Sequence, residues 1–137
     1  MAMTRVKAVL THEQIIEKWD EMTPRERDAW VAEVVYGWDN GMLNDARIAQ
    51  AYGFDGGMPY YTTNIYTAEL VLAKIPGEVY IYRKTTGDFV VSFGYSDEGC
   101  PECGEEPFEV LAQGKAPTLS EAICLAALIA KLSESSV

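Results

Sequence analysis

Two cysteines separated by two residues form the sharpest chemical motif of the sequence. Cys100 and Cys103, in the segment 100–104 (CPECG), can place two thiolates on one zinc ion. A structural zinc site has four ligands, and the other obvious soft donors of the chain are Cys124 and His12. Cys124 falls in an apolar helical segment, which is typical of a buried cysteine, and His12 stands at a predicted helix start. Two alternatives stay open: a zinc half-site completed by a second copy of the chain, and a tight polar loop without metal.

The surroundings of this cysteine pair favour neither catalysis nor redox chemistry. The motif does not follow a strand and open a helix, as the pair of a thioredoxin-like unit does. Residues 97–109 carry six acidic side chains and no lysine or arginine. This composition is typical of a solvated loop, or of a surface that docks a basic partner.

A second group of residues surrounds the turn-rich stretch 39–61. Aromatic rings close to an arginine can clamp a small molecule that bears a nucleobase, and an arginine at a predicted hairpin turn can meet its phosphates. The candidate ligand-binding residues are Trp38, Arg47, Tyr60, Tyr61, Tyr66 and Arg83. The alternative is that these aromatic side chains pack in the core and staple helices together.

The sequence offers no catalytic constellation. It has one histidine and no nucleophile motif, which disfavours Ser/His and Cys/His mechanisms. It has neither a phosphate-binding loop nor a glycine-rich dinucleotide fingerprint. We therefore predict that the protein is not an enzyme.

Capping signals predict the helices that must position these residues. Thr11 with Gln14 predicts one helix start, and Thr23 with Glu26 predicts a second helix over about residues 24–36. The stretch 39–61 is expected to be a long loop with a short helical turn at 46–51. A further helix is expected after Thr63 as its N-cap, ending at Pro76.

The period of the apolar pattern then changes from helical to alternating. Residues 78–83 and 89–95 predict two strands joined by a turn at 85–88, and residues 108–112 predict a third strand. Phe89, Val91, Phe93 and Tyr95 are expected to face the core. The last helix starts after the N-cap Thr118. This order predicts a single α+β domain over residues 1–137, with helices packed around a small antiparallel sheet and a fraying tail at 133–137.

Composition and charge limit the classes of partner that the protein is expected to bind. The chain has 21 acidic and 11 basic residues, a net charge of -10. Such a surface disfavours nucleic-acid binding, because it repels phosphate backbones. The longest apolar run, residues 122–130, is too short to cross a bilayer, and the start lacks a secretory h-region. We expect a cytoplasmic protein with no membrane association.

Three segments together resemble the phage ABA sandwich domain family. They are residues 27–38 (RDAWVAEVVYGW), 59–65 (PYYTTNI) and 120–128 (SEAICLAAL), and the resemblance covers most of residues 23–132. It implies an α-β-α layered fold and a phage or prophage origin, and it brings no catalytic residues. Two features depart from the family pattern: Asn64 stands where an aspartate is common, and the segment 100–104 is not part of that pattern.

These observations rank the functions. The first hypothesis is a non-enzymatic phage accessory protein that counteracts host defence, either by sequestering a small nucleotide signal or by blocking a host protein. Sequestration would suit a homo-oligomer with a pocket between subunits. The alternative is a structural or assembly protein of the phage without a small-molecule ligand.

Overall fold

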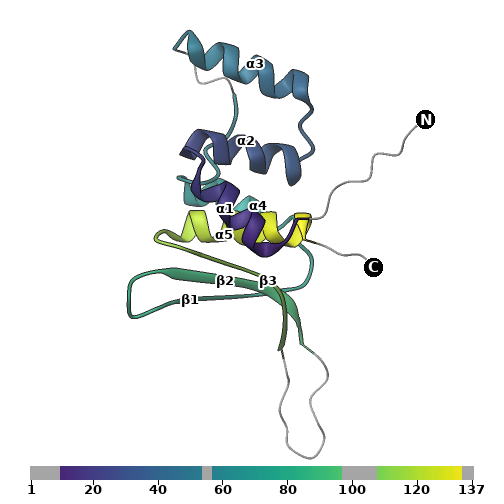
Figure 1. The fold of residues 1–137 in the computed structure, drawn as a ribbon, viewed down its shortest axis with the longest axis vertical. Helices are drawn as coiled ribbons and strands as arrows, with labels where there is room; N and C mark the ends of the chain where they lie inside the picture. The colour runs from purple at the N-terminus through teal and green to yellow at the C-terminus, as the bar shows by residue number, and fades with distance from the viewer. Residues whose placement is uncertain (1–9, 54–56, 97–107, 134–137) are drawn as a thin grey trace, which may run out of the picture.

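The computed structural model describes residues 10–53, 57–96 and 108–133 (Figure 1). The helices are α1 (His12–Asp20), α2 (Pro24–Val34), α3 (Asn40–Ala51), α4 (Ile65–Leu72) and α5 (Leu119–Leu132). The strands are β1 (Glu78–Arg83), β2 (Phe89–Ser96) and β3 (Phe108–Ala116). They form an antiparallel sheet in the order β1-β2-β3. The predicted α+β class, with helices packed against a small antiparallel sheet, is confirmed.

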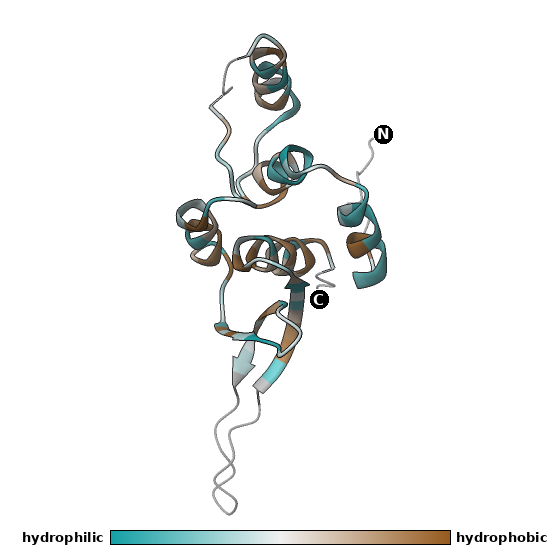
Figure 2. Ribbon diagram, turned by 90° about the vertical axis from the view of Figure 1, so that its left-hand side faces the viewer, coloured by the Kyte–Doolittle hydropathy of each residue, from teal (hydrophilic) through white to brown (hydrophobic). Residues whose placement is uncertain are grey.

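The helices of the described residues lie on one side of the sheet (Figures 1 and 2). The helix α5 lies directly over β2 and β3, and α1, α2 and α4 surround it. The helix α3 projects furthest from the sheet. The opposite face of the sheet leaves Tyr80 and Tyr82 each half exposed. None of the helices in the described ranges combines the length and the apolar character that a bilayer crossing requires.

The helix α5 forms the centre of the core. Its predicted cap is confirmed, because the Thr118 side chain accepts a hydrogen bond from the Glu121 N–H. Every residue from Ala122 to Ile129 is buried, so the helix is covered on all sides and not on one face only. Figure 2 shows the corresponding apolar colouring along this helix. A helix that is apolar all round is stable only in such a position.

The strand β3 is longer than predicted, and the reason lies in its contact with α5. It runs to Ala116, past the predicted end at Ala112. Small residues are needed here: a Cβ built on Gly114 would lie 2.5 Å from the backbone nitrogen of Ala126. Glycine weakens a strand in isolation, but here it admits the helix backbone. Sequence propensity alone therefore ended the strand too early.

The first two helices begin as predicted. Thr11 with Gln14 and Thr23 with Glu26 each form a complete capping box. Each box satisfies two backbone N–H groups that a helix start otherwise leaves without partners. The turn between the two helices is short: the Glu21 N–H donates to the Lys18 carbonyl oxygen at the end of α1, and Thr23 caps α2.

Three local predictions are wrong. The stretch expected to be a long loop contains α3, whose N-cap Asp39 accepts a hydrogen bond from Met42 N–H at 2.9 Å. The cap of α4 is Asn64 and not Thr63, since the Asn64 side chain accepts from Tyr66 N–H. Tyr95 was expected to face the core, but it is half exposed. Its ring instead lies close to Gly77, just before β1, where an added Cβ would be 3.4 Å from it.

Candidate functional site

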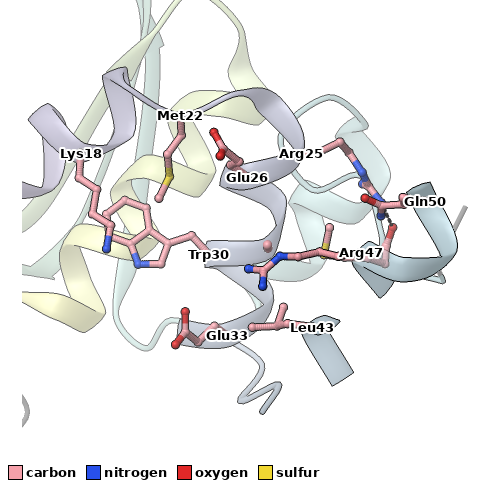
Figure 3. Close-up of a pocket in the computed structure, with 11 residues that line it drawn as sticks. Lys18, Met22, Arg25, Glu26, Trp30, Glu33, Leu43, Arg47 and Gln50 are labelled. Carbon is pink, nitrogen blue, oxygen red and sulfur yellow. Dashed lines mark hydrogen bonds between the residues drawn. The ribbon is translucent and has the colours of Figure 1, made fainter. Parts of the chain in front are cut away.

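A cavity of about 480 Å³ lies between α2, α3 and the end of α1 (Figure 3). This volume is in the range of pockets that bind small ligands, about 300–1,000 Å³. We call it the α2–α3 cleft. Its lining residues are Lys18, Met22, Arg25, Glu26, Ala29, Trp30, Glu33, Leu43, Arg47, Gln50 and Met58.

Trp30 supplies the aromatic surface of the cleft. Its side chain is buried, and the ammonium of Lys18 lies over the ring, 4.8 Å from its centroid. The capping box of α2 fixes the start of the helix that carries Trp30, and α1 carries Lys18. The cation–π contact therefore places a positive charge beside an aromatic side chain in the lining of the cleft.

Arg47 supplies a second cation from the other side. It belongs to α3 and is exposed, and its guanidinium lies 3.3 Å from the Asn44 side-chain oxygen. In Figure 3 its side chain extends from α3 toward Trp30. Glu26 and Glu33 of α2 line the same cleft and are exposed. The cleft thus presents cations for anionic groups and carboxylates for hydrogen-bond donors.

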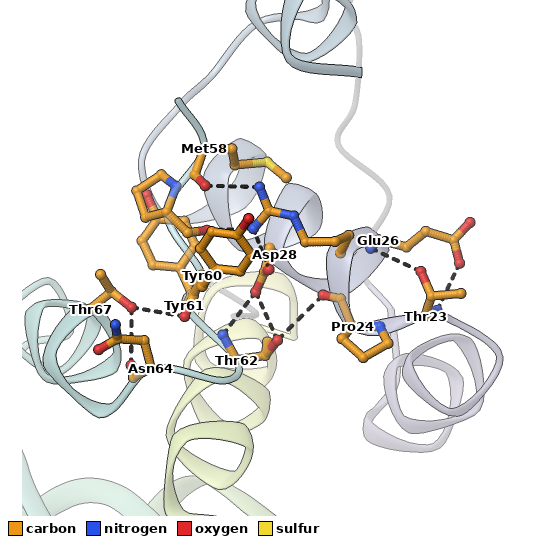
Figure 4. A network of polar contacts seen from close by, with 12 residues as sticks. Thr23, Pro24, Glu26, Asp28, Met58, Tyr60, Tyr61, Thr62, Asn64 and Thr67 are labelled. Carbon is orange, nitrogen blue, oxygen red and sulfur yellow. Dashed lines mark hydrogen bonds and ion pairs between the residues drawn. The ribbon is translucent and has the colours of Figure 1, made fainter. Parts of the chain in front are cut away.

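Arg25 forms part of the wall rather than a free cation. Its guanidinium donates to the Asp28 carboxylate at 2.7 Å and to the carbonyl oxygens of Met58 and Pro59 (Figure 4). It also lies 3.8 Å from the centroid of the Tyr60 ring. These contacts attach the segment that follows α3 to α2. The cleft therefore keeps its shape through Arg25.

Asp28 of α2 binds the same segment, between α3 and α4, at Thr62. It is fully buried, and its Oδ1 atom accepts hydrogen bonds from the backbone and the hydroxyl of Thr62 (Figure 4). Its Oδ2 atom accepts the bond from Arg25. A buried carboxylate is tolerated only with such partners.

Tyr61 lies in the core beneath this network. Its ring stacks on that of Tyr36, with centroids 5.1 Å apart and planes inclined by 14°. Burial, aided by Tyr36 and Asp28, raises the pKa of Tyr61 to about 12. Burial likewise raises the pKa of the Tyr36 hydroxyl. Both rings therefore stay neutral at physiological pH.

Cys124 packs against the same tyrosines. Its thiol donates to the Tyr61 carbonyl oxygen at 3.3 Å. Burial raises the pKa of this thiol well above its ordinary value, and nearby Asp28 adds to the shift. A reactive cysteine needs a lowered pKa and access to solvent. Cys124 is therefore a core residue and not a nucleophile.

The structure brings together only part of the predicted ligand set. Arg47 lines the cleft, and Tyr60 lies behind it against Arg25. Trp38 is half buried between α2 and α3, outside the lining, and Tyr61 is enclosed in the core. Tyr66 is exposed on α4.

Arg83 lies at the end of β1, on the far side of the helical layer from α3 (Figure 1). Arg47 and Arg83 therefore do not meet within one copy of the chain. Cys100 and Cys103 lie outside the described residues, so zinc binding there stays a prediction. Within the described ranges, no three histidine, cysteine or acidic side chains are grouped so as to hold a metal ion.

Sequence reasoning missed Lys18, Trp30 and Glu33 as lining residues. Trp30 is a buried residue of α2, so it belongs to the core as well as to the lining of the cleft. Trp30 and Glu33 are three residues apart, so they share a helical face. That spacing was the available signal, but the position of α3 above this face is a tertiary fact.

The fold is similar to that of a solved phage protein from Bacillus cereus ATCC 14579. The TM-score is 0.51, the sequences are 21% identical, and the match covers 78% of this chain and 85% of the other. A likeness at this identity shows the fold alone. No protein-family model and no curated protein matches the sequence.

Proposed function

We propose that this chain is a phage or prophage accessory protein of the ABA sandwich type that acts by binding, not by catalysis. In this proposal it takes a nucleotide-sized signal of the host defence into the α2–α3 cleft and so withholds it from its receptor. The observation that supports this proposal best is the cleft itself. Lys18 of α1 lies over the ring of Trp30, and Arg47 of α3 extends toward the same ring (Figure 3).

The chemistry of the cleft supports a ligand with a planar ring and a negative charge. Arginine and lysine side chains bind phosphate oxygens, and an indole edge or face contacts a base. Glu33 suits the N–H and O–H groups of a base and a ribose, as does the Glu26 oxygen that does not accept from Thr23 N–H. The fold of the Bacillus cereus phage protein and the three sequence segments of the ABA sandwich family support the phage origin.

Native mass spectrometry of the protein purified from its bacterial host tests the sequestration. We expect a retained mass of nucleotide size that is absent from the denatured protein. Isothermal titration with a panel of mono-, di- and cyclic nucleotides then identifies the class. Arg47→Ala is expected to weaken binding by about tenfold or more, since a charge-assisted contact contributes about 1.5–3 kcal/mol.

Lys131→Ala is the matched control, because Lys131 is an exposed cation in the last turn of α5 and does not line the cleft. Loss of binding in both variants would indicate a general charge effect. A ligand-free native mass, together with no binding to any nucleotide of the panel, would refute sequestration.

Blocking of a host protein is the second candidate, and the surface of α3 favours it. Ile48 on this projecting helix and Tyr52 at its C-cap are exposed, and their spacing of four residues places them on one face. Exposed apolar side chains in a group are typical of protein interaction sites. This candidate predicts that a host protein binds the natural chain, that Ile48→Lys abolishes this binding, and that no nucleotide binds. A pull-down from host lysate with both chains measures the first two.

A further inference from the structure

We propose that two copies of this chain join through β1, edge to edge and antiparallel, into one continuous sheet with three strands from each copy. The inference is independent of the ligand of the α2–α3 cleft. It rests on the hydrogen-bonding pattern of β1, on the side chains that this strand exposes, and on the charges at its two ends.

The outer edge of β1 presents a regular row of backbone groups. In the described residues β1 pairs with β2 alone. At the hairpin, Lys84 N–H donates to the Asp88 carbonyl at 2.7 Å, so the backbone of Lys84 points toward β2. Because antiparallel ladders alternate, Tyr82 and Tyr80 also point their backbones inward. The alternate residues of β1, at the odd-numbered positions 79, 81 and 83, therefore point their N–H and C=O groups outward, away from β2.

These outward groups belong to Val79, Ile81 and Arg83. The side chains beside them are apolar and accessible: Tyr80 is 50% exposed, Ile81 44% and Tyr82 50%. Three consecutive exposed apolar residues cover both faces of the strand edge. An exposed, regular, apolar edge is the type of edge that pairs with another strand.

Among the residues that the structure describes, the other edge of the sheet carries protective features that β1 lacks. The register of β3 against β2 shifts between the partners of Phe93 and Gly94, which marks a β-bulge. Lys115 on β3 is exposed as well. Bulges and edge lysines are the devices by which proteins prevent edge pairing. The pairing of β1 with β2 runs without a register shift, and its central residues carry no charge.

The sequence of β1 is complementary to itself when read in opposite directions. With Ile81 facing the partner's Ile81, the outward backbone groups of Val79 face those of the partner's Arg83. This register pairs only outward-pointing positions, as an antiparallel ladder requires. A slip by one residue would place inward-pointing positions opposite outward-pointing ones and exchange the faces of the sheet.

The side chains agree with this register. Tyr80 lies opposite the partner's Tyr82 on the open face, and aromatic pairs across strands are stabilising. Glu78 lies opposite the partner's Lys84, and the symmetry repeats this opposite-charge pair. Because the chain carries a net charge of -10, two copies repel each other at long range. The two ends of β1 locally offset that repulsion, so a second copy is the partner that fits this edge.

The experiment is to measure the molar mass of the full chain by light scattering after size exclusion, over a range of concentrations. We expect a dimer for the natural sequence. Ile81→Lys places two ammonium groups opposite each other at the centre of the interface, and it is expected to weaken the dimer by about tenfold or more. Leu70→Lys is the matched control on α4, where Leu70 is also exposed, and it should leave the dimer unchanged.

The register itself is tested by cross-linking. The variant Ile81→Cys brings the two substituted positions face to face and should give a disulfide between copies under mild oxidation, mapped by mass spectrometry to position 81. Val79→Cys should not give such a disulfide, because in this register each position 79 lies opposite position 83 of the other copy and the two cysteines are far apart. A monomeric natural chain, a dimer that survives Ile81→Lys, or an equal yield of both disulfides would overturn the proposal. So would a monomer that holds a host polypeptide on this edge.

Discussion

Thr62 donates two hydrogen bonds to one oxygen of Asp28, from its backbone N–H at 2.8 Å and from its hydroxyl at 2.7 Å. The two residues are 34 positions apart in the sequence, and both are buried. Together with Arg25 they fix the segment between α3 and α4 on α2. Since α3 and α2 form the two walls of the cleft, this pair supports the candidate site without lining it.

Removal of the Asp28 carboxylate is expected to destabilise the fold. Asp28→Ala leaves the Thr62 N–H without its acceptor and removes the only carboxylate among the acceptors of Arg25 in the described residues, which should lower the free energy of unfolding by about 3 kcal/mol. Urea denaturation followed by tryptophan fluorescence measures the change. Glu33→Ala, at an exposed carboxylate of the same helix, should stay within about 0.5 kcal/mol of the natural chain. Equal effects of the two variants would contradict this role of Asp28.

Helix α5 and strand β3 approach each other closely at Gly114. A Cβ there would lie 2.5 Å from Ala126 N and 2.7 Å from the Ala122 carbonyl oxygen. Gly114→Ala should therefore force α5 away from β3 and lower the melting temperature, at a cost of about 1–3 kcal/mol. The control is Gly41→Ala in α3, whose added methyl meets only an ordinary contact at 3.4 Å. It should be neutral or stabilising, because alanine is the better helix former.

Tyr36 offers a test in the opposite direction. Its hydroxyl is buried, and it has no hydrogen-bond partner among the residues that the structure describes. Tyr36→Phe keeps the stack on Tyr61 and removes the unsatisfied group, so it should raise the free energy of unfolding by about 1 kcal/mol. Differential scanning calorimetry can detect this change. A lower stability would mean that the hydroxyl has a partner in the folded protein.

The raised pKa values predict a loss of stability in alkali. Tyr61 has a pKa of about 12 in the folded chain against an ordinary value of 10.0. The unfolded chain therefore releases this proton first, and stability falls as the pH rises above 10; the raised pKa of Cys124 starts the decline near pH 9. Tyr61→Phe should remove part of the decline, on the order of 2 kcal/mol at pH 12.

Urea titrations at successive pH values measure that dependence. Tyr66→Phe is the control, because Tyr66 is a tyrosine on α4 that is 77% exposed. Parallel pH profiles for the natural chain and Tyr61→Phe would show that Tyr61 ionises in the folded state as easily as in the unfolded one.

Local signals in the sequence determined most of the secondary structure. The capping boxes at Thr11 and Thr23 and the cap at Thr118 each join residues three positions apart. Their formation therefore depends on local sequence and not on which distant segments pack against the helix. The bounds of β1 were predicted correctly for a similar reason, since its β-forming residues end at a turn in which Gly87 takes a positive φ of 102°. These features depend on neighbours along the chain.

The candidate site was decided by tertiary contacts. Sequence reasoning placed Arg47 in a ligand set with Tyr61 and Arg83, yet Tyr61 is enclosed in the core and Arg83 lies on the sheet. Only residues 46–51 of α3 were predicted to be helical, because the glycine and asparagines of its first half lower helix propensity, which the Asp39 cap and the burial of Leu43 offset. Composition sets what each residue can do, whereas proximity between distant residues is set by which apolar faces bury each other. The sequence by itself therefore determined most of the elements and the starts of several of them, and only the placement of α3 beside α2 decided where the α2–α3 cleft lies.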